Sequence, residues 1–258
     1  MSSPAIIEYT LHLADNALVL GHRNSEWTGH GPILEQDIAL SNIALDLIGQ
    51  ARNLYQSAAG VMGTDGREER ATTTEDDLAY MRDAWDFRNC LLVEHPNGDW
   101  GMTMLRQFFF SAWQYYFYGE LRHSRDNMLA AIAVKSLKEV TYHLRWSGEW
   151  VIRLGDGTDE SHSRMVKAME HLWQFTGELF EPAAYEKMLV AEGIAVDLAV
   201  IRPMWDQRVN EVLSAAQLTY GSSGWMQTGG KQGKHTEHLG YLLAEMQFLQ
   251  RAYPGCEW

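Results

Sequence analysis

The sequence predicts an all-α protein, an up-and-down helix bundle with extra helices at its C-terminal end. Apolar residues recur at helical spacing over long stretches, short breaks rich in Gly, Pro and Asp separate these stretches, and the alternating pattern of strands is almost absent. A length of 258 residues and a hydrophobic share of 46% allow one sizeable core. We therefore expect a single domain that covers residues 1–258.

The first half of the chain predicts four helices. The first runs from Ile6 to Gly21 and ends at a glycine followed by polar residues, and a longer one runs from Ile33 to about Ala58. The stretch from Gly60 to Asp77 is rich in Gly, Thr and charge, so we expect a loop before a third helix from Leu78 to Glu94. A fourth helix begins near Asp99, and its many aromatic residues place it at the centre of the bundle.

The second expected helix carries two different stripes. Apolar side chains recur at helical spacing, at Leu34, Ile38, Leu45, Ile48 and Ala51. Polar side chains recur at every fourth residue, at Asn42, Asp46 and Gln50. The spacing alone leaves open whether this polar stripe faces solvent or a buried polar site.

The second half of the chain predicts further helices of decreasing length. A polar break at residues 124–127 precedes a fifth helix from Met128 to Leu154, and Thr158 or Ser161 is placed to cap a sixth. A glycine-rich loop runs from Gly221 to Gly233. The other expected helices are Ala183 to Ala191, Pro203 to Leu218 and Thr236 to Arg251.

Composition and charge exclude several classes of function. The chain has 34 acidic and 21 basic side chains, and its formal net charge of −13 would repel nucleic acids and anionic membrane surfaces. Two cysteines cannot form a disulfide framework, the N-terminus lacks the features of a secretory signal, and no apolar run is long enough to span a bilayer. We expect a cytoplasmic protein with neither nucleic acid nor a membrane as partner.

The middle of the expected bundle nearly matches a di-iron site. Such a site takes a Glu from each of two helices and a Glu-x-x-His pair from each of two others. Here Tyr142 stands three residues after Glu139, where the histidine is required, and Gln114 stands where a carboxylate is wanted. We therefore expect a metal-free polar layer and no catalytic residue in this chain. The expected layer contains Asp46, Asp83, Asp86, Lys138, Glu139 and His143.

Two other pairs match a metal-ligand spacing. Glu120 and His123 form a strict Glu-x-x-His pair, but they lie beside a turn about 20 Å from the level of Glu139, so we interpret them as a solvated helix end. Glu139 and His143 share a helix face and would suit one zinc ion, yet no third ligand is apparent at their level. A buried salt bridge or hydrogen-bonded network that involves Lys138 is the alternative, and we prefer it.

The loop Thr228 to Lys234 resembles a phosphate cradle, because it is rich in glycine and precedes a helix. It lacks the Walker pattern, since Thr228 replaces the first glycine and His235 replaces the Ser or Thr. We therefore expect a flexible loop or a docking segment. His235 and His238, three residues apart, could bind metal together with Glu237, but we prefer to interpret them as solvated side chains at a helix start that Thr236 caps.

Several blocks together resemble a known family, in order and over nearly the whole chain. They are Leu34 to Leu40, Ala44 to Arg52, Leu91 to Gly98, Lys138-Glu139 with Tyr142 to Arg145, Arg153 to Thr158, and Thr228 to Lys231 with His235 to Gly240. The blocks resemble the PaaC family, the C subunits of bacterial phenylacetyl-CoA epoxidase (phenylacetate-CoA oxygenase). The resemblance implies a ferritin-like bundle.

The resemblance also implies a function in aerobic phenylacetate degradation. The complex converts phenylacetyl-CoA to its ring-1,2-epoxide. In this family the catalytic A subunit holds the di-iron centre, a small B subunit joins the complex, and a reductase with NADPH, flavin and iron-sulfur groups supplies electrons. The C subunit is a non-catalytic relative of A that stabilises it. It carries no cofactor of its own, in agreement with the incomplete ligand set.

The resemblance further implies that the C subunit helps to hold the CoA part of the substrate. Its arginine and lysine would meet phosphates, its asparagine would donate hydrogen bonds, and its apolar side chains would pack on adenine or pantetheine. The alternative for the first four positions is a helix face packed on the fourth helix. The positions are Asp86, Phe87, Arg88, Asn89, Lys187, Met188 and Leu189.

Two other functions stay open at this point. As an enzyme in its own right, the chain would be a ferritin-like oxidase with two metal ions, and it would need Glu139. As a metal-free scaffold, it would form a closed symmetric homo-oligomer without an A partner.

Overall fold

The computed structural model describes residues 3–63, 73–219 and 224–256, and every regular element among them is a helix. The all-α prediction is confirmed. Four short 3-10 helices lie between the α-helices, at Ala84–Asp86, Trp173–Phe175, Gly177–Phe180 and Gly230–Gln232. The α-helices are α1 Ser3–Ser25, α2 Leu34–Gly63, α3 Glu75–Tyr80, α4 Leu91–Glu94, α5 Trp100–Leu121, α6 Asn127–Gly155, α7 Asp159–Leu172, α8 Ala184–Ala191, α9 Leu198–Ala215, α10 Glu237–Met246 and α11 Phe248–Ala252.

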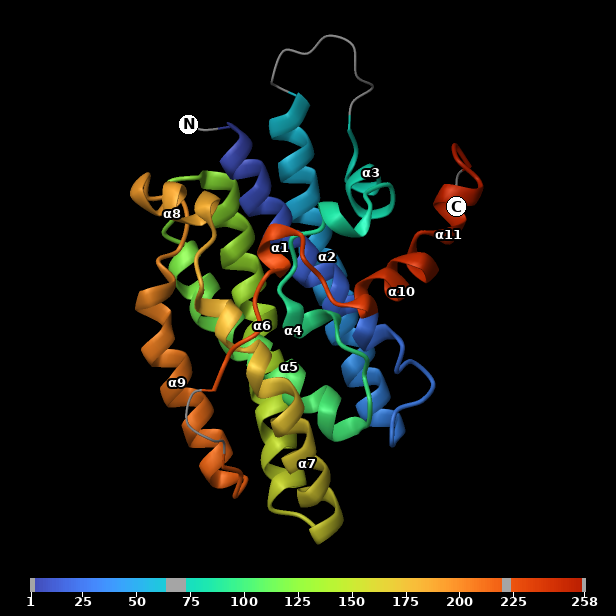
Figure 1. Cartoon of the computed structure of the whole chain (residues 1–258), viewed down its shortest axis with the longest axis vertical. Coiled ribbons are helices and arrows are strands. Elements are labelled where there is room, and N and C mark those ends of the chain that lie inside the picture. The colour runs from blue at the N-terminus through green and yellow to red at the C-terminus, as the bar shows by residue number, and fades with distance from the viewer. Residues whose placement is uncertain (1–2, 64–72, 220–223, 257–258) are drawn as a thin grey trace.

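Four long helices, α1, α2, α5 and α6, form the body of the bundle (Figure 1). Helix α1 packs along α2, α5 packs along α6, and α2 also contacts α6. Helices α7 and α9 cover α5 and α6, while α10 and α11 extend away from the bundle (Figure 1). Residues 64–72 of the expected loop after α2 and residues 221–223 of the glycine-rich loop lie outside the described residues.

The aromatic helix α5 lies at the centre of the bundle, as its composition predicts. Phe108, Phe109 and Phe110 are fully buried, and the rings of Trp113 and Phe117 stack with 4.4 Å between their centroids. The indole N–H of Trp113 donates to the carbonyl oxygen of Leu179 at 3.0 Å, so its polar end is satisfied inside the core. These aromatic side chains therefore hold the core together.

The predicted third helix, Leu78 to Glu94, is wrong. After α3 the chain makes the 3-10 turn Ala84–Asp86 and then an extended segment of residues 87–90 before α4 begins. Side chains from other elements accept backbone N–H groups of two residues of this segment and of Leu91, the first residue of α4. Asp15 Oδ2 accepts from Arg88 N at 2.7 Å, Asn16 Oδ1 from Cys90 N at 2.8 Å, and Glu178 Oε2 from Leu91 N at 2.7 Å.

Helix boundaries elsewhere move for identifiable local reasons. The N–H of Ser161 donates to the Thr158 side chain at 3.1 Å, which confirms the predicted cap of α7. Helix α9 begins five residues before Pro203, because the Asp197 side chain caps its first turn. The expected last helix divides in two at Gln247, whose amide donates to the carbonyl oxygens of Ala79 and Arg82.

The glycine-rich loop packs tightly from Gly229 to Lys234, so the expectation of a flexible loop is wrong there. Lys231 is 1% exposed, and its Nζ lies 3.1 Å from Glu186 Oε2 and 3.0 Å from the carbonyl oxygen of Glu181. Glu178 Oε1 accepts from Gly229 N at 2.8 Å. A Cβ atom on Gly230 would lie 2.2 Å from the carbonyl oxygen of Asn89, so only glycine fits at this position.

The buried ion pair gives a direct test of this packing. Lys231→Met leaves the Glu186 carboxylate buried and unpaired, so we expect the free energy of unfolding to fall by about 3–5 kcal/mol. Denaturant unfolding of the purified chain measures the change. The exposed Lys234→Met serves as a matched control, with an expected change within about 0.5 kcal/mol. A loss below about 1 kcal/mol for Lys231→Met would contradict the structural role of the pair.

Candidate functional site

A layer of polar side chains crosses the middle of the bundle between α2, α5 and α6. Gln50 Nε2 donates to Glu139 Oε2 at 2.9 Å, and Gln50 Oε1 accepts from Gln114 Nε2 and from the Tyr118 hydroxyl, each at 3.3 Å. Beside them, His143 Nε2 lies 2.9 Å from Asp46 Oδ2. We call the side chains of Asp46, Gln50, Gln114, Tyr118, Glu139 and His143 the polar layer.

Gln50 is the centre of the polar layer, because it both donates and accepts within it. The Gln50 amide N–H donates to one carboxylate oxygen of Glu139. The Gln50 amide oxygen accepts from two donors on α5, the Gln114 amide and the Tyr118 hydroxyl. Burial raises the pKa of Tyr118, with the nearby Glu139 charge acting in the same direction, so the phenol keeps its proton and remains a donor. The layer is therefore a network of hydrogen bonds that joins carboxylates, amides, an imidazole and a phenol from three helices, while the buried Gln114 Oε1 and His143 Nδ1 make no hydrogen bond within the described residues.

The polar layer does not contain a complete metal-ligand set. Among the residues that the structure describes, no three His, Cys, Asp or Glu side chains are placed to hold one metal ion. The amide of Gln50 on α2 bonds to Glu139, and the amide of Gln114 on α5 bonds to Gln50. A neutral amide is a weaker ligand for iron or zinc than a carboxylate or an imidazole.

The structure brings together Asp46, Glu139 and His143 from the predicted layer and places the other three members elsewhere. Lys138 is exposed on the outer side of α6. Asp83 and Asp86 are exposed because the third helix is interrupted, and Asp86 accepts the backbone N–H of Asp83 in the 3-10 turn. The polar network around Lys138 that we expected is therefore built around Gln50.

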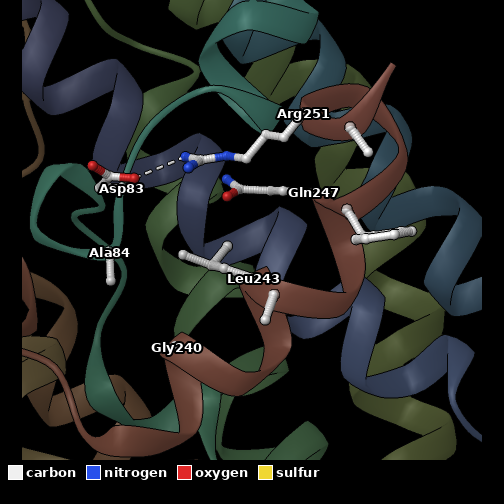
Figure 2. A pocket seen from close by; sticks show the side chains of 9 residues that line it. Asp83, Ala84, Gly240, Leu243, Gln247 and Arg251 are labelled. Carbon is white, nitrogen blue, oxygen red and sulfur yellow. Dashed lines mark hydrogen bonds and ion pairs between the residues drawn. The ribbon is translucent and has the colours of Figure 1, made fainter. Parts of the chain in front are cut away.

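Asp83 belongs to a surface groove of about 510 Å³ between its turn and helices α10 and α11 (Figure 2). Its Oδ1 accepts from Arg251 Nη2 at 2.9 Å. Leu243, Gln247 and Phe248 are among the other lining residues. The groove is lined mostly by apolar side chains, unlike a metal site. Its ion pair between Asp83 and Arg251 joins α11 to the turn.

The seven predicted CoA-binding positions fall into two groups. Phe87, Asn89 and Leu189 are fully buried. The guanidinium of Arg82 lies 4.3 Å from the centroid of the Phe87 ring, and Asn89 Nδ2 donates to Glu94 Oε2 at 2.9 Å. These buried side chains therefore hold the extended segment and α8 in place. The alternative of a helix face packed on α5 is wrong for this segment, because it is not helical.

The other predicted CoA-binding residues reach the surface. Asp86, Lys187 and Met188 are exposed. Arg88 is half-buried, and its Nη1 donates to the carbonyl oxygens of Trp85 at 2.8 Å and Phe87 at 2.9 Å. Its guanidinium is therefore partly committed to the turn that carries it.

Asp15 on α1 organises this region, although no sequence motif pointed to it. The carboxyl group is fully buried, forms an ion pair with Arg82, and accepts from the Tyr55 hydroxyl at 2.5 Å as well as from the Arg88 backbone. Burial, and then the Asp15 charge, raise the pKa of Tyr55. The sequence feature that could have indicated its role is an aspartate within the apolar pattern of α1.

His235 is not the solvated side chain that the sequence suggested. Its Nδ1 lies 2.8 Å from Glu94 Oε2, and its Nε2 lies 3.0 Å from the carbonyl oxygen of Phe87. Burial alone would lower its pKa, but the hydrogen bond and charge of Glu94 outweigh burial and raise the pKa. Glu94 also accepts from Thr236 N at 2.6 Å, so this pair fastens the start of α10 to α4.

A cluster of histidines lies next to this junction. His95 is buried, with ring centroids 4.0 Å from Phe175, 5.1 Å from His171 and 5.5 Å from His238. Burial first, and then the two neighbouring histidines, lower the pKa of His95 to about 3. The ring is therefore neutral in the folded protein near neutral pH.

Comparisons with known proteins agree on one assignment. A family model described as "Phenylacetic acid catabolic protein" matches residues 1–258. The chain is 48% identical over 250 residues to the C subunit of 1,2-phenylacetyl-CoA epoxidase from Escherichia coli (strain K12), and the match covers 97% of this chain and 98% of that relative. None of the described helices is long and apolar enough to cross a membrane, in agreement with the apolar pattern of the sequence.

His95 generates a pH-dependent prediction. With a folded pKa of about 3 against roughly 6.5 when unfolded, the unfolded chain binds more protons at acid pH. Stability should therefore fall as the pH drops below about 6, and this residue accounts for about 1.4 kcal/mol per pH unit down to about pH 4. His95→Leu should reduce the pH slope of the unfolding free energy by that amount.

The control for the lost packing is Phe175→Leu, which removes a neighbouring ring without removing a titratable group. Its pH slope should equal that of the unsubstituted chain. Parallel pH profiles for His95→Leu and the unsubstituted chain would show that the buried ring does not oppose protonation.

Proposed function

The chain belongs to the family of phenylacetic acid catabolic proteins, and we propose that it is the non-catalytic C subunit of a phenylacetyl-CoA epoxidase. In this proposal the chain stabilises a catalytic A subunit that holds the di-iron centre. A small B subunit joins the complex, and a reductase that uses NADPH, flavin and iron-sulfur groups supplies the electrons. The chain itself contributes a folded bundle and no reacting group.

The hydrogen bonding of the polar layer is the observation that carries this proposal. A di-iron bundle needs carboxylates and imidazoles that are free to bind metal. In this chain the Glu139 carboxylate accepts a hydrogen bond from the Gln50 amide, and the Asp46 carboxylate is hydrogen-bonded to His143. The side chains at the level of the missing site therefore bind one another, which keeps the bundle folded without metal.

Contact with the CoA part of the substrate is a second component of the proposal. Arg88 and Lys187 are the candidate contacts for phosphate groups, because both reach the surface and carry positive charge in a strongly acidic chain. Met188, 49% exposed on α8, would pack on an apolar part of CoA. Asp86 is exposed on the turn before Arg88, while Phe87, Asn89 and Leu189 would act only by positioning these side chains.

The complex with the catalytic subunit tests the role of the polar layer. Glu139→Ala removes the carboxylate that Gln50 bonds within the described residues, yet we expect epoxidase turnover and iron content of the complex to change less than about threefold, since in this proposal neither depends on this layer. Some stability should be lost, about 1–3 kcal/mol, because a buried amide loses its acceptor. Glu139→Gln, which keeps an acceptor oxygen at this position, is the matched control.

Joint loss of iron and turnover in both Glu139→Ala and Glu139→Gln, with the stability of Glu139→Gln unchanged, would contradict the proposal, because the amide keeps the hydrogen bond to Gln50 but removes the carboxylate ligand. That outcome would instead support the alternative, an oxidase with two metal ions in this chain.

A supporting subunit should itself be stabilised by its partner. We expect the midpoint of thermal unfolding of this chain to rise with the concentration of the catalytic subunit, because the partner binds the folded form alone. Calorimetry of the isolated chain and of mixtures measures the effect. A midpoint that does not respond, together with a closed homo-oligomer in solution, would favour the scaffold alternative.

A further inference from the structure

Helix α2 has an apolar stripe on its outer side as well as on its inner side. Leu40, Ile43, Leu47 and Leu54 face inward and are fully buried. Of the five apolar positions that the sequence pattern emphasised, Ala51 is also buried and the other four point outward. The exposed fractions are 71% for Leu34, 52% for Ile38, 65% for Leu45 and 37% for Ile48. We call these four residues the α2 stripe.

The spacing of the α2 stripe identifies the kind of surface that would cover it. Its residues follow steps of four and three along the helix, with Ser41 and Arg52 at the remaining positions of that series. Alternating steps of four and three are the a and d positions of a heptad, which accept the side chains of a second helix lying almost parallel to the first. A helix that is apolar on both sides is normally buried on both sides.

The charges beside the α2 stripe indicate the chemistry of that second helix. Asp46 pairs with His143 and Gln50 with Glu139, so α2 and α6 run antiparallel, and the turns of α6 that carry Lys138 and Lys135 lie just beyond the C-terminal end of the stripe, at the level of residues 51–54. Both lysines are exposed, and within the described part of the chain neither has a carboxylate at ion-pair distance. A helix that covers the stripe and carries acidic side chains along its edge would pair with them.

A second copy of this chain fits the surface less well. It would offer the same two lysines beside the same stripe, and it would bring together two chains that each have a net charge of −13. A different chain with an acidic edge avoids the repulsion between the matching lysines. The charges therefore favour a heteromeric contact.

We propose that the α2 stripe, with Lys135 and Lys138 near its C-terminal end, is the docking surface for an amphipathic, acidic-edged helix of the catalytic subunit. This inference rests on the proposed function. It also connects the interface to the polar layer, because Leu45 and Asp46 are adjacent on α2 and the Asp46 side chain is half-exposed while His143 is buried. Docking covers the open side of this pair and shields it from water.

Another exposed apolar surface lies on the C-terminal helices and serves as the control. Phe248, which is 61% exposed, lines the groove of Figure 2, and Tyr241 and Leu249 of the same two helices are also exposed. Helix α11 spans only five residues and offers no stripe of several turns. Its neighbouring charges, Asp83 and Arg251, already pair with each other.

The test measures binding of purified variants to the catalytic subunit by titration calorimetry and size-exclusion chromatography. Leu45→Glu places a carboxylate in the centre of the stripe, and we expect affinity to weaken by roughly 100-fold. Lys135→Glu with Lys138→Glu should slow association about tenfold at low salt and much less at high salt. Phe248→Glu, an equally exposed control, should bind within about threefold of the unsubstituted chain.

The outcomes separate this inference from the proposed function. Absence of binding by the unsubstituted chain would contradict the proposed function itself. Binding that survives Leu45→Glu but is lost in Phe248→Glu would overturn the inference and move the interface to the C-terminal helices. A homodimer that Leu45→Glu dissociates, with no effect on the heteromer, would assign the stripe to a second copy. Since Leu45 is exposed, unchanged thermal unfolding should show that the variant folds.

Discussion

The buried carboxyl group of Asp15 decides which helices make up the bundle. By accepting from the Arg88 backbone and pairing with Arg82, it holds the chain after α3 in an extended path across α1. A buried carboxyl group needs such partners, and the extended segment supplies them where a helix would have used its own N–H groups internally. Helix α1 is thereby one of the four helices of the core, and the residues between α3 and α4 cross over α1 as an extended segment.

The same principle, that buried polar groups must find partners, explains the polar layer. Once α1 takes the place of the expected third helix, the middle of the bundle receives its polar residues from α2, α5 and α6 alone. Gln50 joins these helices because an amide both donates and accepts. We propose that these hydrogen bonds keep the bundle folded where a metalloprotein would use its ions, and this property underlies the proposed role of supporting a catalytic relative.

The sequence predicted the helical architecture well and the interrupted region poorly. Periodicity and capping residues located α2, α5, α6 and α7, since each depends mainly on local spacing or on a cap such as Thr158. Residues 78–94 also have helical spacing, but Asp15 and Glu178 come from distant parts of the chain and override it. Counting residues from the turns places Asp46 and His143 at the same level of the bundle, so their proximity could be predicted. The central position of Gln50 depends on side-chain directions, which residue spacing does not determine.

If this bundle supports a metalloprotein without binding metal itself, iron analysis should show it. Iron per chain would be measured in the isolated protein and in its complex with the catalytic subunit, purified through a tag on this chain. We expect iron only in the complex, in proportion to the catalytic subunit. Stoichiometric iron in the isolated chain, lost on Glu139→Ala, would show that the polar layer is a working metal site and that the proposed supporting role is wrong.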